Sequence, residues 1–564
     1  MAALPSVASA VLIRQQDWIA RKWRQKRGLM QQGELLNGKG IKSFSSSLAH
    51  LLEFGLKRRP TAPALHDTQA CLTFDDLDRR SNALCLVLQN TYGIQSGDRV
   101  AILTETSLEI VISAIAIWKA GAVYVPIDCQ NAPKRTEYIL QTIEPSLLIS
   151  SEKYLAEAQD LAPEIPRLSY ETIRSLDQAG GEPPMSPARG DDPAIIIHTS
   201  GSTGLPKGAV LSHHSVIHYF HNHNEFLRFD EDSQGLNNGP FHFDVSIQDT
   251  FLPLYFGATV RFHEHLFVSS IMINLIKRER ITHLLTVSSV LELISKDSIK
   301  LEQLRDSSLR VVLVGGEICD PKLINRWLTI IPNLCVLNGY GPTECNSVSV
   351  IHEITKPDFG RDALYPIGKP LRGMKVVLLD EQEQVIQSNY LTGGLALAGP
   401  QLMLGYWRNP IQTEKAFRTI HGEKYYVTGD QCYRDKEENY HFVGRRDMEI
   451  KIRGRRINLN EIRNALLGHE KVSYAAVGAL RIDEELRIAA FVHVEHVDDH
   501  VFQALEQTLL TRVPSYMFPS YLCASTQLPK TSSEKVNEKQ ILETINDLVL
   551  REPGRKYFAI DGII

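Results

Sequence analysis

The string "IIIHTSGSTGLPKGAVLSHHSV", residues 195–216, places hydroxyls, glycines and one lysine directly after three isoleucines. Glycine lets a backbone approach an anion closely, so the N–H groups and hydroxyls of such a loop can surround a phosphate, and a lysine adds a point charge. The loop is not a Walker A sequence, because Gly208 stands where that pattern requires a hydroxyl. Composition alone leaves two interpretations, a phosphate-binding loop and a flexible hairpin. The candidate phosphate-binding residues are Thr199, Ser200, Gly201, Ser202, Thr203, Gly204 and Lys207.

Short apolar runs and helical patterns alternate around this loop. Strands alternating with helices indicate mostly parallel sheets with helices on their faces, so the expected fold class is α/β. A helix with one apolar face, ended by glycine, is predicted at 107–121. Buried strands are predicted at 99–105, 122–128, 146–150, 194–200 and 310–316.

The composition is that of an ordinary globular protein with more than one domain. The chain has 564 residues, 43% hydrophobic and 23% charged, and a formal charge of −5, so nucleic acid is not an expected partner. Its eight cysteines form no CxxC pair, which argues against a zinc site or a disulfide framework. Neither a signal peptide nor a membrane-length apolar run is present, so we expect no membrane partner and a cytoplasmic location.

Further strings resemble, in order, the motifs of the adenylate-forming superfamily, which includes acyl-CoA synthetases, luciferases and nonribosomal peptide synthetase adenylation domains. The resemblance implies a two-step reaction, in which a carboxylate attacks the α-phosphate of Mg·ATP and a thiol then attacks the resulting acyl-adenylate. It covers about residue 45 to about 545. Besides the loop, the matching strings are "LTFDDLDRRSNALC", "WKAGAVYVPID", "NGYGPTECN", "YPIGKP", "YVTGDQCY", "GRRDMEIKIRGRRIN" and "LPKTSSEKVN".

The resemblance assigns the nucleotide-binding roles to particular residues. Tyr340 would stack on adenine, Thr343 would donate to the α-phosphate, and Glu344 would ligate Mg²⁺, which prefers carboxylate oxygen. Asp430 would accept hydrogen bonds from both ribose hydroxyls, with Arg445 adding a ribose or phosphate contact. The glycines that flank Tyr340 in the motif are Gly339 and Gly341.

The resemblance also implies a mobile C-terminal part. Asp447 matches the family hinge, and Lys535 matches the lysine that neutralises charge during adenylation. The expected organisation is an N-terminal extension (1–44), a large domain of α/β layered sheets (45–446) and a small mobile C-terminal α+β domain (447–564). The pattern departs from the family at Glu534, beside the lysine, and at Gly394, where glutamate is usual.

The string "FHFDVSIQDTF" (241–251) indicates the substrate class. Asp244 matches the aspartate that pairs with the α-ammonium of an amino acid, and a buried ammonium requires such a counter-ion. The alternative is a capping or structural role for this aspartate. Positions matching the family's specificity lining carry no second charge, which favours proline or another small or medium apolar amino acid. They are Val245, Gln248, Leu285, Leu313, Gly315, Gly339, Ser347 and Val348.

The thiol acceptor is inferred from the length of the chain after Lys535. Only 29 residues follow that lysine, too few for a carrier domain, so we expect a phosphopantetheinylated carrier protein in trans. The main hypothesis is an amino acid–carrier protein ligase that uses ATP and Mg²⁺. The alternatives are an acyl- or aryl-CoA synthetase using free coenzyme A, and a non-catalytic scaffold that retains nucleotide binding.

Overall fold

The computed structural model describes most of the chain beyond residue 46. The described ranges are 47–176, 186–199, 205–263, 268–296, 298–361, 363–445, 449–483, 485–529 and 536–560. Several predicted residues therefore lie outside the described ranges. They are the N-terminal extension 1–44, Ser200, Gly201, Ser202, Thr203, Gly204, Asp447, Glu534 and Lys535.

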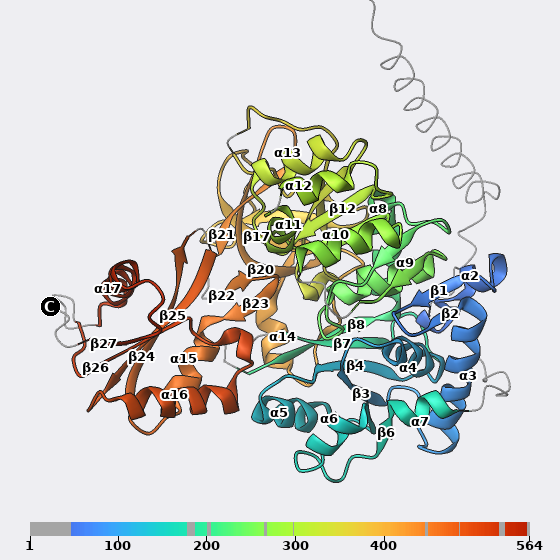
Figure 1. The fold of residues 1–564 in the computed structure, drawn as a ribbon, viewed down its shortest axis with the longest axis horizontal. Coiled ribbons are helices and arrows are strands. Elements are labelled where there is room, and N and C mark those ends of the chain that lie inside the picture. The colour runs from blue at the N-terminus through green and yellow to red at the C-terminus, as the bar shows by residue number, and fades with distance from the viewer. Residues whose placement is uncertain are drawn as a thin grey trace, which may run out of the picture. The chain divides into compact units, whose positions relative to one another are not determined.

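The largest described sheet has nine strands, most of them parallel (Figure 1). Strands β9 to β13 run parallel to one another, and β14 turns back beside β13. In sheet order the strands are β15 (Lys369–Pro370), β14 (Val350–Ile354), β13 (Cys335–Tyr340), β12 (Val311–Gly315), β11 (His283–Thr286), β9 (Gln234–Leu236), β10 (Thr259–Arg261), β1 (Pro63–His66) and β2 (Cys71–Thr73).

A second sheet of seven strands contains four of the five predicted strands. Each of these four begins and ends within one residue of its prediction, and the fifth is β12 of the nine-stranded sheet. The predicted α/β class with mostly parallel pairing is therefore confirmed. In sheet order the strands are β18 (Gly405–Tyr406), β8 (Lys207–Ser212), β7 (Pro193–Thr199), β4 (Val123–Asp128), β3 (Arg99–Thr104), β5 (Leu147–Ser150) and β6 (Arg167–Ser169).

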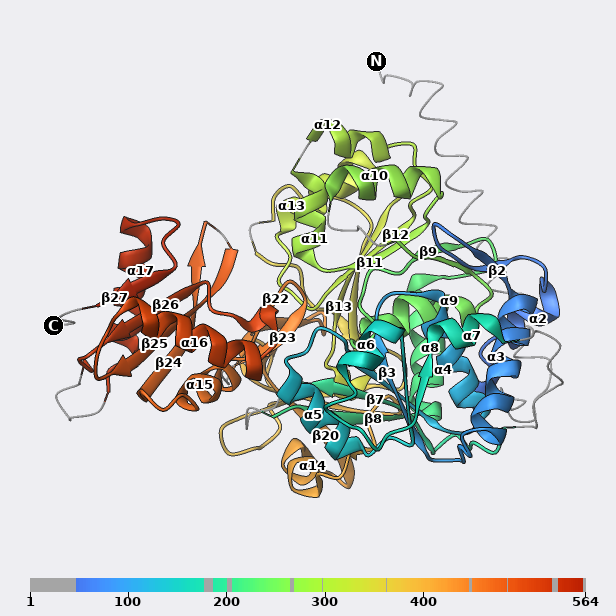
Figure 2. The same cartoon turned by 60° about the horizontal axis from the view of Figure 1, so that its bottom comes forward.

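The main hydrophobic core lies between these two sheets. Alternate residues of β3 divide between two clusters: Val100 and Ile102 face the shared core, whereas Ala101 and Leu103 face helices α5 and α6 on the outer side. Helices α10, α11 and α13 cover the other outer face, that of the nine-stranded sheet (Figure 2). The large part of the molecule is thus built from alternating layers of helices and sheets.

Helix α4 (Leu108–Lys119) fills the predicted helical segment, but it differs from its prediction in one respect. Every one of its side chains is buried, including two that are charged, instead of a single apolar face. Burial is possible because Glu109 pairs with Arg174 at 2.7 Å and Lys119 pairs with Asp78 at 2.7 Å. A helix buried on all sides carries no amphipathic pattern from which its depth could be predicted.

Helices connect and cover the sheets. No helix among the described residues is long and apolar enough to cross a membrane. The α-helices are α2 (Glu53–Arg58), α3 (Phe74–Asn90), α4, α5 (Pro133–Ile143), α6 (Glu152–Glu157), α7 (Tyr170–Ser175), α8 (His213–Leu227), α9 (Leu252–Tyr255), α10 (Ser269–Arg278), α11 (Ser288–Ser295), α12 (Ser298–Leu301), α13 (Pro321–Ile330), α14 (Pro410–Ala416), α15 (Leu459–Leu467), α16 (Asp499–Arg512) and α17 (Glu538–Arg551).

The remaining strands form a five-stranded antiparallel sheet, a two-stranded hairpin and a four-stranded sheet. In the five-stranded sheet β20 and β21 pair antiparallel, with Asp430 opposite Arg445. The strands are β16 (Lys375–Leu379), β17 (Gly393–Ala398), β19 (Phe417–Ile420), β20 (Glu423–Arg434), β21 (Tyr440–Arg445), β22 (Glu449–Ile452), β23 (Arg455–Asn458), β24 (Val472–Ile482), β25 (Glu485–Val494), β26 (Tyr521–Ser525) and β27 (Tyr557–Ala559).

Two core clusters contain only residues that follow residue 449. Helices α15 and α16 pack on one face of the four-stranded sheet, and α17 packs on the other (Figures 1 and 2). This segregation is expected of an α+β unit with its own core. The domain boundaries themselves stay a proposal.

Candidate active site

Three predicted nucleotide residues lie at strand ends in the two large sheets. Thr199 ends β7, Lys207 begins β8 directly opposite it, and Tyr340 ends β13. The carboxyl ends of strands in an open α/β sheet are where ligands usually bind. The described residues of the predicted phosphate loop therefore lie at the edge where such a ligand is expected.

Glu344, the predicted magnesium ligand, lies in the short helix Thr343–Cys345 and is completely buried. Its carboxylate accepts a hydrogen bond of 2.8 Å from Tyr406 Oη and pairs with Arg456 Nη1 at 3.2 Å. Burial opposes its ionisation, but Arg456, Tyr406 and Lys207 outweigh burial and hold the pKa of Glu344 below its usual value. Lys207 completes the group, with its Nζ 4.5 Å from the Tyr406 ring centre.

Tyr340, Asp430 and Arg445 also lie together. The Tyr340 hydroxyl donates to Asp430 Oδ2, and Arg445 Nη1 donates to the other carboxylate oxygen at 2.8 Å. The structure thus brings together the three side chains assigned to the adenine and the ribose. The Tyr340 hydroxyl was not predicted to contact the aspartate.

The hairpin β22–β23 contributes a group of charges that the sequence did not assign to the site. Its Glu449 accepts from both Arg445, at 2.7 Å, and Arg456, at 2.5 Å. Lys451, on the same hairpin, is partly buried; burial lowers its pKa, while Asp430 and Asp244 favour its charged form. The hairpin therefore places two cations, Lys451 and Arg456, among the predicted acids of the site.

The two aspartates of the string 241–251 have different surroundings. Asp249 is buried and accepts hydrogen bonds of 2.9 Å from the backbone N–H groups of Asn238 and Gly239, and burial raises its pKa to about 6. Asp244 is only partly buried. Burial also raises its pKa, which a hydrogen bond with Thr343 and the charge of Lys451 oppose. Asp249 therefore holds the backbone in place, whereas Asp244 faces the candidate site.

The apolar part of the predicted lining comes from three adjacent strands. Leu285 of β11 and Leu313 of β12 are cross-strand partners, and Gly315 pairs with Gly339 of β13. A Cβ atom added to Gly339 would lie 3.0 Å from Leu313 Cδ1 and 3.3 Å from Val348 Cγ2. Leu313 and Val348 therefore meet over Gly339, which leaves no space for a side chain there.

Two further lining residues, Val245 and Ser347, pack closely against glycines. A Cβ added to Gly239 would meet Val245 Cγ1 at 2.0 Å, and one added to Gly341 would meet the Ser347 carbonyl oxygen at 2.1 Å. Ser347 itself has a φ of 70°, a conformation that side-chain-bearing residues adopt rarely. The loop after Tyr340 is thus folded back sharply, and it fixes where the Ser347 hydroxyl lies.

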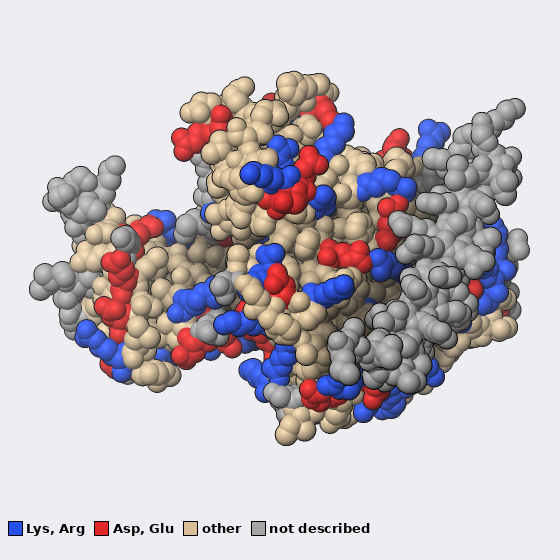
Figure 3. Space-filling model, turned by 90° about the horizontal axis from the view of Figure 1, so that it is seen from above, with Lys and Arg blue, Asp and Glu red and all other residues tan. Residues whose placement is uncertain are grey.

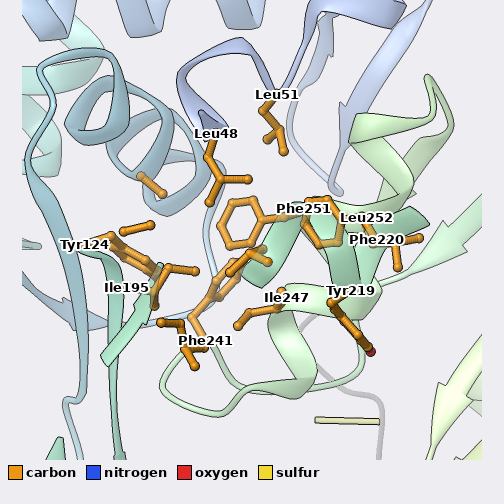
Figure 4. Close-up of a cluster of buried hydrophobic side chains, with 14 of the residues drawn as sticks. Leu48, Leu51, Tyr124, Ile195, Tyr219, Phe220, Phe241, Ile247, Phe251 and Leu252 are labelled. Carbon is orange, nitrogen blue, oxygen red and sulfur yellow. The ribbon is translucent and has the colours of Figure 1, made fainter. Parts of the chain in front are cut away.

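Tyr219, on helix α8, is a site residue that the sequence analysis missed. It is fully buried, and its hydroxyl donates to Gln248 Oε1 at 2.9 Å and also hydrogen-bonds with Ser347. In Figure 4 this hydroxyl points away from the apolar cluster around Phe251. Gln248 itself lies in a π-helical segment, Ile247–Phe251, a local geometry frequent at functional sites. The lining is therefore more polar than predicted.

Tyr406 and Arg456 were missed for different reasons. Arg456 belongs to the basic run at 444–456, in which the sequence assigned roles to Arg445 and Asp447 only. In the structure it is 17% exposed and pairs with Glu344. It stands in the string "GRRDMEIKIRGRRIN", so that motif could have identified it as a site residue. Tyr406 lies between motifs, and no pattern in the sequence marks it.

The donor set fits magnesium. Mg²⁺ is commonly bound by one or two carboxylates together with substrate phosphates, and Glu344 and Glu449 both contact Arg456. Among the residues that the structure describes, no cluster of three or more His, Cys, Asp or Glu side chains is arranged to hold a metal ion by itself.

Comparison with known proteins assigns the fold and the site to a family. The sequence profile of the family described as AMP-binding enzyme matches residues 52–407. The chain therefore belongs to the AMP-binding enzyme family. It is an adenylate-forming ligase of the kind that nonribosomal peptide synthetases contain as adenylation domains.

Individual relatives support this assignment. Gramicidin S synthase 1 of Brevibacillus brevis is 28% identical over 92% of this chain and 47% of its own length. Tyrocidine synthase 2 of Brevibacillus parabrevis is 31% identical over 88% of this chain and 14% of its own length. The chain thus spans less than half the length of these two relatives.

Solved structures show the same fold. An artificially fused adenylation–PCP di-domain, NpsA-ThdA from Klebsiella oxytoca, superposes with a TM-score of 0.74 at 26% identity, covering 86% of this chain and 94% of its own. The o-succinylbenzoate CoA synthetase of Bacillus subtilis superposes with a TM-score of 0.76 at 22% identity, covering 88% and 98%. At that identity the second likeness concerns the fold alone.

Proposed function

We propose that this chain uses ATP to activate an amino acid as its aminoacyl-adenylate and then loads it onto the phosphopantetheine thiol of a separate carrier protein. Asp244 is the observation that carries the amino-acid assignment. It is a partly buried carboxylate that faces the site, whereas the neighbouring Asp249 is used by backbone N–H groups. A buried α-ammonium group requires such a counter-ion, whereas fatty and aryl acids have no positive charge that could pair with Asp244.

The side chain of the substrate would be uncharged. Leu285, Leu313 and Val348 offer no partner to a charge, and Gln248 and Ser347 add only neutral hydrogen-bonding groups. Proline and other small or medium apolar amino acids are the candidates that the sequence favours. Tyr219 adds polar contacts at the lining, so polar uncharged amino acids are candidates as well, and an assay has to decide among them.

In the first half-reaction, a carboxylate oxygen of the amino acid bonds to the α-phosphorus of ATP, and the bond to the β-phosphate oxygen breaks to release pyrophosphate. Thr199 and Lys207 would orient the β- and γ-phosphates, and Thr343 would donate to the α-phosphate. Tyr340 would lie against the adenine, with Asp430 and Arg445 at the ribose. Mg²⁺ held by Glu344 would neutralise phosphate charge.

In the second half-reaction, the thiolate of the carrier attacks the carbonyl carbon, and the bond to the phosphate oxygen breaks to release AMP. The thiol proton passes to solvent. Rotation about Asp447 would move Lys535, which adenylation needs, out of the site. The same rotation would bring in the face of the mobile domain that the thiol reaction needs. The proposed organisation is a large domain to residue 446 and a mobile domain beyond it, acting in the cytoplasm. The adenylation–PCP di-domain NpsA-ThdA, at 26% identity, supports a carrier acceptor.

Amino-acid-dependent exchange of labelled pyrophosphate into ATP tests the proposal. We expect exchange with at least one uncharged amino acid and its loss in Asp244→Asn. Exchange that depends on a fatty or aromatic acid instead would contradict the amino-acid assignment. It would favour the second candidate, an acyl- or aryl-CoA synthetase that uses free coenzyme A.

A further inference from the structure

Glu317 connects the nine-stranded sheet to the hairpin β22–β23. It follows β12 by two residues, and its two carboxylate oxygens have different partners. Oε2 accepts hydrogen bonds from Ser288 Oγ at 3.1 Å and from the Ser289 N–H at 3.0 Å, at the start of helix α11. Oε1 accepts a bond of 2.8 Å from the backbone N–H of Gly454, at the turn of the hairpin.

The turn of the hairpin fits closely against Glu317 and Val287, which together form what we call the seat. Arg453 and Gly454 form a two-residue turn and both have positive φ, 50° and 74°, as in the type I′ turns of tight hairpins. A Cβ atom added to Gly454 would lie 2.6 Å from Val287 Cγ1. Gly454 is therefore required twice, by the turn and by its close approach to Val287.

The seated hairpin places Arg456 against Glu344. Arg456 lies two residues beyond Gly454, and its Nη1 is 3.2 Å from Glu344 Oε2. A magnesium ion at Glu344 would have to displace this guanidinium, because both cations need the same carboxylate oxygens. In Figure 2 the hairpin lies between the four-stranded sheet and strand β13, near the end of which Glu344 is located.

We propose that Glu317 is a positioning residue, which seats the hairpin turn through Gly454 and so holds Arg456 on the magnesium carboxylate. The seated arrangement suits the state after pyrophosphate and its metal have left, when Glu344 needs another cation. The hairpin must leave the seat for Mg·ATP to bind at Glu344. The inference rests on the proposed function, because it takes Glu344 as the metal ligand of an ATP-using enzyme.

The variant Glu317→Ala in the full chain tests this role. Loss of one charge-assisted hydrogen bond should weaken the seat about tenfold. Hydrogen exchange of the backbone amides of residues 449–458, followed by mass spectrometry without ligands, should then be about tenfold faster. The seated hairpin, with Arg456 on Glu344, competes with Mg·ATP and would be less populated in this variant. The KM for Mg·ATP in pyrophosphate exchange should therefore fall, by up to about tenfold. A mutation that merely damaged the structure would raise this KM or lower kcat.

Ser288→Ala is the matched control. It removes one hydrogen bond to Glu317 at helix α11 but leaves the bond to Gly454, so residues 449–458 should exchange as in the unmodified chain. A second variant keeps the test independent of the carboxylate: Gly454→Ala should unseat the hairpin, and adding Val287→Ala should restore part of the protection by removing the clash.

Three results would overturn the inference: unchanged exchange of 449–458 in Glu317→Ala, a KM for Mg·ATP that rises, or the same effects in Ser288→Ala. Failure of the proposed function is recognised separately. In that case the unmodified chain catalyses no pyrophosphate exchange with any amino acid, while hydrogen exchange still reports whether the seat exists.

Discussion

Replacing Arg456 by glutamine should destabilise the protein and at the same time create a stronger magnesium site. Arg456 is 17% exposed and contacts Glu344 and Glu449, which are 0% and 4% exposed. Removing one partner of a buried ion pair typically costs about 3–5 kcal/mol, because the remaining charge is left unpaired. Here two carboxylates would face the vacated position, which is the donor set that Mg²⁺ favours.

Magnesium should therefore recover part of the lost stability. If the two carboxylates bind Mg²⁺ with a dissociation constant of about 0.1 mM, a concentration of about 10 mM contributes about 2.7 kcal/mol to the free energy of unfolding. Thermal unfolding followed by circular dichroism, with and without MgCl₂, measures this recovery. The unmodified chain should respond much less, because Arg456 competes with the ion.

Arg445→Gln is the matched control for this experiment. Arg445 is 13% exposed and pairs with Asp430 and Glu449, so its loss should also destabilise the protein. In this variant Arg456 would still pair with both Glu344 and Glu449, so the position that magnesium would take stays filled. Equal recovery by magnesium in both variants, or none in Arg456→Gln, would refute the assignment of Glu344 as the metal ligand.

Three further predictions concern the substrate residues and a buried histidine. Asp244→Asn should lower kcat/KM for the amino acid about a hundredfold or more, the cost of an unpaired buried ammonium, whereas Asp249→Asn should mainly lower the melting temperature. Tyr219→Phe should change relative kcat/KM values among uncharged amino acids by about tenfold, through the loss of its bond to Gln248; an unchanged ranking in a panel assay would exclude a role in selection. His223 is fully buried, and burial lowers its pKa to about 3, so the unfolded state takes up its proton first and stability falls as pH drops below about 6.5. His223→Phe should reduce this fall by about 1.4 kcal/mol per pH unit between about pH 6 and 4, and denaturant unfolding at several pH values would show no difference if the histidine were charged when folded.

The strands could be predicted because their apolar runs are continuous and end at polar loops. This is the pattern of parallel strands buried on both faces, and β3, β4, β5, β7 and β12 all show it. The order of the strands within each sheet could not be predicted. It depends on packing between distant segments, such as β10 beside β1, which leaves no local periodicity.

The candidate site could be predicted where a motif contains the residue. Tyr340, Asp430 and Arg445 were assigned from three separate strings, and both Tyr340 and Arg445 hydrogen-bond to Asp430. Tyr219 could not be found in this way, because its role depends on a neighbour, Gln248, that is 29 positions away in sequence. Such a contact exists only once helix α8 has packed against the π-helical segment.

Surface charge carries little information about function in this chain. Acidic and basic side chains are interspersed on the face seen in Figure 3, as the formal charge of −5 suggests. The basic run at 444–456 illustrates the difficulty. Three of its cations, Arg445, Lys451 and Arg456, are directed at acids of the site, so their number in the sequence overstates what the run offers to a partner.

Pyrophosphate exchange over a panel of carboxylic acids tests the proposed function most directly. The panel should contain the twenty protein amino acids, common non-protein amino acids, and fatty and aryl acids, each with the unmodified chain and with Asp244→Asn. We predict exchange that depends on at least one uncharged amino acid and is lost in the variant. Exchange driven by an acid without an ammonium group, or amino-acid-dependent exchange that survives in Asp244→Asn, would contradict it.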